Sequence, residues 1–184
     1  MNKLTRISAA LVASLAIAGT AKSATMGAYV GVGLGDVILR TSAVGFQQAN
    51  FGEKVFVGYN AAQHFGIEGA FTYFETSSSG TVAYSLEAIN VEGKAYFPVV
   101  LDNKLNIFGL AGVALVYSKT SNPATTGTTT VRPVLGLGIS YDFTPKLTGN
   151  VEGSRIFGRG KLNTSSKAIP NADMLSVGLA YNFG

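Results

Sequence analysis

The 184-residue sequence contains no cysteine and no tryptophan, and its only histidine is His64. The absence of cysteine excludes disulfide bonds and thiolate metal sites. A serine or cysteine nucleophile activated by histidine would have to use His64. Neither this residue nor the dispersed carboxylates have the spacing of metal ligands. We therefore expect no metal, no cofactor and no enzymatic activity.

Charged side chains are scarce, at 13% of all residues, whereas glycine occurs 23 times. The formal net charge is +4, but Lys3, Arg6 and Lys22 belong to the N-terminal segment, and without these three the 14 basic side chains become 11, against 10 acidic ones. The chain thus lacks the positive surface that nucleic-acid binding requires. Such a composition is poor for a soluble surface and suits a wall that faces lipid around a crowded interior.

Long apolar runs are also missing after Ser23. No stretch there approaches the ~20 residues of a transmembrane helix. At the N-terminus, Lys3 and Arg6 precede the apolar stretch Ile7–Ala18, and small residues follow it. This layout predicts a cleavable secretory signal peptide, residues 1–23. Cleavage after Ala21 is the alternative.

The remaining residues, 24–184, form one predicted domain in which apolar residues alternate with small or polar ones. In segment 65–73 every odd position except Gly69 is apolar or aromatic, and the even positions include Glu68 and Thr72. A period of two indicates a β-strand with two different faces. Similar segments are 30–35, 54–60, 89–97, 135–143, 147–154 and 175–183, and segment 105–117 is the weakest because both of its faces are apolar or small.

The connections between these segments alternate in length. Those at 60–64, 98–104 and 144–146 are short, whereas those at 36–52, 76–83, 118–130 and 158–173 are longer and rich in Ser, Thr, Gly and Asn. Short periplasmic turns and longer outer loops are typical of outer-membrane barrels. The predicted fold is therefore all-β: an eight-stranded antiparallel up-and-down transmembrane β-barrel with a periplasmic N-terminus. His64 then lies in a short inner turn, away from any outer-leaflet substrate.

A soluble antiparallel barrel or sandwich is the alternative fold, and it would turn its charges outward. Here the charged residues share a face with glycines, as Lys54 does with Gly58 and Glu68 does with Gly66. Glycine relieves crowding, so this face is predicted to point into a tight lumen.

Aromatic residues on the opposite face fall at two heights. Amphipathic rings concentrate where a membrane protein crosses the two interfaces. The predicted inner-rim girdle comprises Tyr59, Phe65, Phe97, Tyr141, Phe143, Tyr181 and Phe183, and the outer-rim girdle comprises Tyr73, Tyr117 and Phe157.

Three features of the C-terminal part are Thr144-Pro145, Val151-Glu152 and the closing run Met174–Gly184. Together they resemble the transmembrane domain of outer membrane protein A (OmpA), a small barrel. The likeness covers most of the mature chain, extending more loosely through Gly58-Tyr59, Phe65–Glu68 and Lys94–Pro98.

In the OmpA family, inward acidic and basic side chains cross the lumen and close it to bulk flow. The resemblance assigns this lumen charge network to Glu68, Lys94 and Glu152. Gly33 and Leu110 stand where the family has basic residues, so a thinner network is expected. Glu68 and Lys94 each lie three residues from an inner-rim phenylalanine, which makes a salt bridge between them geometrically sensible.

These observations predict an integral protein of a Gram-negative outer membrane with a mainly structural and surface role: envelope integrity, and adhesion through the extracellular loops. The alternative is a small gated diffusion channel for ions or small solutes. Unpaired buried charges are costly, so a paired network that keeps the lumen closed is favoured.

The protein is expected to be monomeric. Its expected partners are outer membrane lipids and lipopolysaccharide, the outer-membrane assembly machinery, and host or cell-surface ligands. Arg155 has the parity of the lipid-facing side near the outer rim. It either snorkels to the headgroups or pairs with a lipopolysaccharide phosphate.

Overall fold

The computed structural model describes residues 26–40, 47–79, 82–99, 104–122, 124–158 and 171–183. Within these ranges no helix is long and apolar enough to cross a membrane. The predicted signal peptide, residues 1–23, lies outside them.

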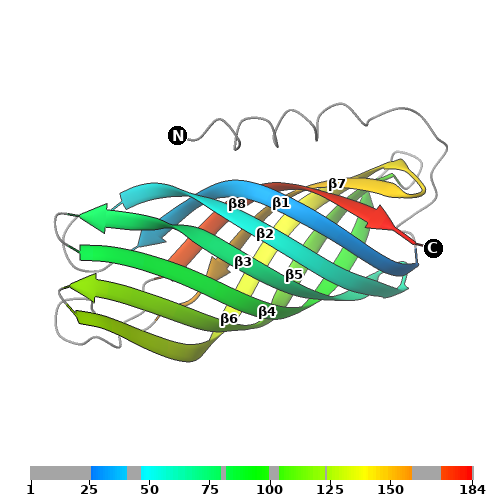
Figure 1. Cartoon of the computed structure of the whole chain (residues 1–184). Helices are drawn as coiled ribbons and strands as arrows, with labels where there is room; N and C mark the ends of the chain where they lie inside the picture. The colour runs from blue at the N-terminus through cyan, green and yellow to red at the C-terminus, as the bar shows by residue number, and fades with distance from the viewer. Residues whose placement is uncertain are drawn as a thin grey trace.

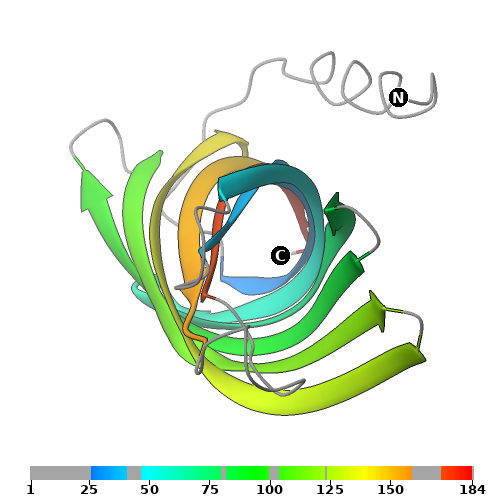
Figure 2. The same ribbon diagram turned by 90° about the vertical axis from the view of Figure 1, so that its left-hand side faces the viewer.

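The described residues form a closed antiparallel barrel in which each strand pairs with the next and the last pairs with the first (Figures 1 and 2). This confirms the predicted fold class. The strands are β1 (Gly27–Arg40), β2 (Gln47–Ala62), β3 (Phe65–Ser79), β4 (Val82–Val99), β5 (Leu105–Asn122), β6 (Ala124–Thr144), β7 (Leu147–Ile156) and β8 (Asn171–Asn182).

One end of the barrel carries the tight turns at residues 63–64 and 145–146, and it also holds the start of β1 and the end of β8. We call this the short-turn end and the opposite one the hairpin end. The hairpin end lies on the left in Figure 1.

The strands close with a stagger. Residue-by-residue pairing leads from Tyr29 on β1 through every strand in turn and returns to β1 at Leu39, ten residues further along. A stagger of this kind tilts the strands against the barrel axis, and a barrel of eight strands is narrow enough for side chains to fill it.

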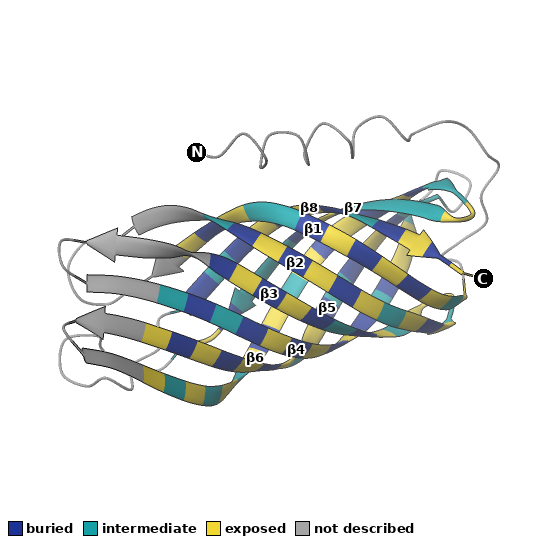
Figure 3. Cartoon of the chain, viewed as in Figure 1, coloured by how far each residue is buried: buried dark blue, intermediate teal, exposed yellow. Residues whose placement is uncertain are grey.

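Buried and exposed residues alternate along most of the described strand lengths, as the colours of Figure 3 show, whereas most residues of β7 are intermediate. On β4, Asn90 and Glu92 are buried, whereas Ile89 and Val91 between and beside them are more than half exposed. In this part of β4, polar side chains thus point into the lumen and apolar side chains point outward. This is the arrangement that a lipid-facing wall requires.

The strands run further toward the hairpin end than the sequence predicted. The expected long connections 36–52, 76–83 and 118–130 are largely extended strand, since β1 continues to Arg40, β3 to Ser79 and β5 to Asn122. Connection 158–173 is shorter by the first residues of β8. In β3 and β5 both faces of these extensions are polar, so no apolar alternation marks them, although threonine favours extended backbone. In β1 the segment Val37–Leu39 is apolar on both faces, so alternation is absent there as well.

Several glycines are required where the interior is crowded. A Cβ on Gly58 would lie 2.2 Å from the Tyr29 ring, and a Cβ on Gly112 would lie 2.1 Å from the Val91 carbonyl oxygen. Contacts this short cannot be accommodated without movement of the backbone or of a packed ring. Gly58 thus leaves room for the Tyr29 ring in the lumen, and Gly112 leaves room for the backbone of β4.

Replacing Gly112 by alanine should destabilise the barrel by about 1–3 kcal/mol, because the new methyl group overlaps the backbone of β4. Gly109→Ala is a matched control on the same strand, since a Cβ there meets nothing within 4 Å. The measurement is the free energy of unfolding in urea, together with the fraction of unboiled protein that keeps folded gel mobility. Equal stability of the two variants would contradict this packing.

Candidate functional site in the barrel lumen

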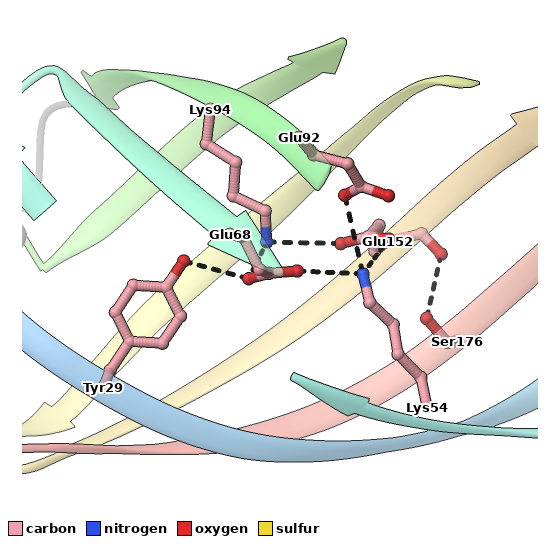
Figure 4. Close-up of polar contacts among 7 residues, drawn as sticks. All are labelled: Tyr29, Lys54, Glu68, Glu92, Lys94, Glu152 and Ser176. Carbon is pink, nitrogen blue, oxygen red and sulfur yellow. Dashed lines mark hydrogen bonds and ion pairs between the residues drawn. The ribbon is translucent and has the colours of Figure 1, made fainter. Parts of the chain in front are cut away.

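The centre of the lumen holds five charged side chains from four strands, Lys54, Glu68, Glu92, Lys94 and Glu152, all of them buried (Figure 4). Glu68 is the central acceptor. Its Oε2 lies 2.6 Å from Lys94 Nζ, and its Oε1 lies 3.0 Å from Lys54 Nζ. Glu152 contacts the same two lysines, at 2.8 Å from Lys54 Nζ and 3.5 Å from Lys94 Nζ.

The structure therefore brings together the three network residues assigned by resemblance, Glu68, Lys94 and Glu152. Lys54 and Glu92 complete the cluster. Their inward parity was visible in the sequence, but which inward side chains lie level across the barrel depends on the stagger of the strands. Lys54 and Lys94, on β2 and β4, converge on Glu68 from either side of β3 (Figure 4).

Neutral groups add to the network. The Tyr29 hydroxyl donates a hydrogen bond of 2.9 Å to Glu68 Oε2. Lys94 Nζ lies 4.9 Å from the centre of the Phe108 ring, and Lys54 Nζ lies 5.5 Å from that of Phe56. A desolvated ammonium gains from such aromatic contact. Together these contacts offset part of the cost of burying charge.

Glu92 is the least tightly held member of the cluster. Its shortest ion-pair distance is 3.9 Å, to Lys54 Nζ, and its Oε2 accepts no hydrogen bond from the described residues. The cluster has three carboxylates and two ammonium groups, so both lysines are already satisfied by Glu68 and Glu152. Glu92 therefore contributes least to the pairing.

Toward the hairpin end, an apolar plug fills the lumen above the charges. All members of the plug are buried, and they come from seven of the eight strands: Val37, Phe74, Leu86, Ala88, Ala114, Val116, Val134, Ile156, Ala172 and Met174. A cavity of about 10 Å³, lined by Lys54 and Asn90 among others, separates the plug from the charges. That volume is at the lower limit for one water molecule.

The plug also explains β5, whose two apolar faces made it the weakest strand prediction. Ala114 and Val116 on its inward face belong to the plug, and Leu110 packs near Phe108 and Tyr96. Ala114 and Val116 thus contact other apolar side chains, and the Phe108 ring lies beneath the Lys94 ammonium. Strict apolar–polar alternation is therefore lost although the strand is regular.

Toward the short-turn end lies the polar vestibule, a cavity of about 40 Å³ whose lining includes Asn60, Asn106, Asp142 and Asn182 beside the rings of Tyr29 and Phe56. Asp142 Oδ1 accepts a hydrogen bond of 2.5 Å from the Thr148 hydroxyl. Asn106 Oδ1 and Asp142 Oδ2 are buried and accept none from the described residues. The vestibule is suited to hold water and ends at the ion network.

The residues of the predicted girdles lie on the outer face. Tyr59, Phe65, Phe97, Tyr141, Tyr181 and Phe183 are exposed near the short-turn end, and Tyr73, Tyr117 and Phe157 are exposed toward the hairpin end. Phe143 is half-buried because its ring packs against Tyr141, with ring centroids 5.3 Å apart. Their position at membrane interfaces stays a prediction.

Arg155 and His64 have local partners. Arg155 pairs with Asp173, its cross-strand neighbour, through two contacts, of which the one from Nη2 to Oδ2 measures 2.8 Å. The sequence offered only lipid partners for this arginine, because the register that places Asp173 beside it was unknown. His64 lies in the turn between β2 and β3, with Nδ1 3.2 Å from the Tyr96 carbonyl oxygen.

Replacing Glu68 by glutamine should destabilise the barrel by about 2–3 kcal/mol, because two buried lysines each lose one of their two close carboxylate partners and keep only Glu152. Glu92→Gln is the matched control and should cost about 1 kcal/mol or less, since only a 3.9 Å contact is lost. The measurement is urea unfolding in the same detergent. A larger loss for Glu92→Gln than for Glu68→Gln would show that the excess carboxylate is the one that matters.

Comparison with known proteins identifies the family. A model described as "Outer membrane protein beta-barrel domain" matches residues 7–183. An uncharacterized protein of Coxiella burnetii is 27% identical, over 72% of this chain and 68% of its own length. Structures of similar fold include Neisserial surface protein A (TM-score 0.72, 17% identity, 85% of this chain and 97% of that one).

Two further structures share the fold. They are Ail, the attachment invasion locus protein of Yersinia pestis (TM-score 0.62, 14% identity, 87% and 100% coverage), and the N-terminal barrel of Pseudomonas aeruginosa OprF (TM-score 0.60, 14% identity, 86% and 98% coverage). At these identities the likeness concerns the fold alone. The chain belongs to the outer membrane protein β-barrel family, whose place is the outer membrane of Gram-negative bacteria.

Proposed function

We propose that the protein has a mainly structural and surface role: it contributes to envelope integrity and makes adhesive contacts through its hairpin end. The observation that carries this proposal is the closed lumen. An ion crossing it would have to separate the Lys54 and Lys94 pairs and then pass the apolar plug. Both steps are costly in a low-dielectric interior.

The hairpin end supports the surface part of the proposal. The β5–β6 hairpin stays paired to its tip, where Asn122 faces Ala124. Its last residues are mostly serine and threonine, and they continue beyond the last apolar residues of the outer face. We propose this paired hairpin, rich in serine and threonine, as the element that makes surface contacts. Ail, a protein of similar fold, is named for attachment and invasion.

A small gated diffusion channel is the second candidate, and the polar vestibule favours it. The vestibule reaches the ion network from the short-turn end, so polar groups line part of the lumen on that side of the plug. In such a channel, the ion pairs and the plug would both have to rearrange for conduction.

Planar-bilayer recording separates the two functions. The wild-type barrel should show no large steady conductance, because the plug leaves no wet path through the described residues. Phe74→Ala, which removes a plug ring from a buried site, serves as the comparison and should raise the frequency of brief openings. Large steady currents through the wild-type protein would favour the channel.

A shortened hairpin tests the adhesive role. Replacing residues 120–126 by Asn-Gly joins Lys119 to Gly127, which face each other across the hairpin, through a two-residue turn suited to antiparallel strands. The barrel should fold as before, and attachment of expressing cells to host cells or matrix should fall several-fold. Unchanged attachment, with equal surface amounts of both proteins, would exclude this hairpin as an adhesive element.

A further inference from the structure

The outer face of the barrel changes from apolar to charged at different levels on opposite walls. β1 and β5 are diametrically opposite in the eight-stranded ring. Val37 on β1 and Ala114 on β5 both point into the plug and belong to the same buried cluster. Their outward neighbours are therefore level with one another across the barrel.

The strand registers also place these residues of β1 and β5 at the same height along the barrel axis. Pairing leads from Asp36 on β1 across β8, β7 and β6 to Gly109 on β5. A full circuit shifts the register by ten residues, so half a circuit shifts it by five. The residue of β5 level with Asp36 is thus Ala114, in agreement with the plug contacts.

On the wall formed by β7, β8, β1 and β2, outward charges occur at this level on all four strands. Asp36 and Glu53 are exposed, and Arg155 and Asp173 form the ion pair described above. Gly52, next to Glu53, lies against Val37 and Met174 of the plug. These four charged residues define what we call the polar wall.

On the opposite wall, β5 and β6 are apolar at this level, whereas the first outward charge on β4 is Glu87, about two residues above the level of Asp36. Val113 and Leu115 on β5 are exposed, as are Leu135 and Val131 on β6. The first outward charge on β5 is Lys119, whose Nζ lies 5.1 Å from the centre of the Tyr117 ring. It lies five residues above the level of Asp36, which corresponds to about 12 Å along the axis of a barrel with tilted strands.

The short-turn end shows no such step. Tyr29 and Asn182 from one wall and Asn106 and Asp142 from the other line one vestibule, so these positions are level. Exposed aromatic residues flank them on both walls, including Tyr181 and Tyr141. A tilt of the whole molecule would displace both edges of the apolar belt. Only its upper edge is displaced, so the belt is shorter on one side.

We infer that the polar wall of β7, β8, β1 and β2 is an interaction surface for the polar headgroup layer of the lipid bilayer, which descends along this wall to the level of Asp36 and Glu53. A charged residue facing lipid is tolerated near an interface and not in the hydrocarbon. Bilayers adjust to a short apolar stretch by thinning locally. The protein thus thins the leaflet at its hairpin end on one side only, whether or not its lumen conducts.

Single-cysteine labelling tests this, because the native chain contains no cysteine. Ile38→Cys and Leu115→Cys place a spin label outward at nearly equal levels on β1 and β5, and they leave all four charges of the polar wall in place. Val32→Cys is the control for lipid contact deeper on β1, where the native side chain is exposed. The proteins are folded into phosphatidylcholine–phosphatidylglycerol vesicles.

The measurement is collision of each label with oxygen, which concentrates in lipid, and with a water-soluble nickel chelate. The label at position 38 should favour the nickel chelate several-fold more than the labels at 115 and 32. Replacing both Asp36 and Glu53 by leucine should shift the label at 38 toward the lipid-type ratio, with the label at 115 unchanged.

Two outcomes would overturn the inference. Equal lipid-type ratios at 38 and 115 in the native background would mean that the belt is even and the charged side chains snorkel. Protection of position 38 from both reagents would mean that a protein surface, such as a second copy of the chain, covers the polar wall. Neither outcome bears on conductance or adhesion, so the proposed function is tested separately.

Discussion

The structure depends on the closure of a sheet in a medium without hydrogen-bond partners. Hydrocarbon cannot satisfy an open strand edge, so the last strand must pair with the first. Here β8 pairs with β1 from Tyr29 to Arg40. Closure of only eight strands makes the interior narrow. Glycines beneath crossing rings, such as Gly58 beneath Tyr29, follow from that narrowness.

In so narrow an interior, buried charged side chains must also pair with one another. Lys54 and Lys94 share Glu68 and Glu152 in the middle of the lumen, and the plug excludes water on one side of them. The interior is thus a packed core with ion pairs at its centre, and most of the outer face is apolar.

The sequence was most informative where lipid imposes a strict alternation and least informative beyond the membrane. Parity alone predicts the strand 65–73, whereas the outer parts of β5 and β6 are polar on both faces and carry no such signal. Parity also places Glu92 and Lys54 on inward faces, but it does not place them in one cluster. The pairing of Arg155 with Asp173 depends on the strand register, which the sequence does not give.

What the sequence determined by itself is the face on which each strand residue lies, because parity is a local property of an extended chain and apolar residues must meet lipid. What only the tertiary structure decided is the level at which side chains from different strands meet. The ten-residue stagger around the barrel places Glu68 between two lysines, Val37 beside the same plug as Ala114, and Asp36 opposite Leu115. That stagger is a property of the closed circuit as a whole, and no single strand carries it.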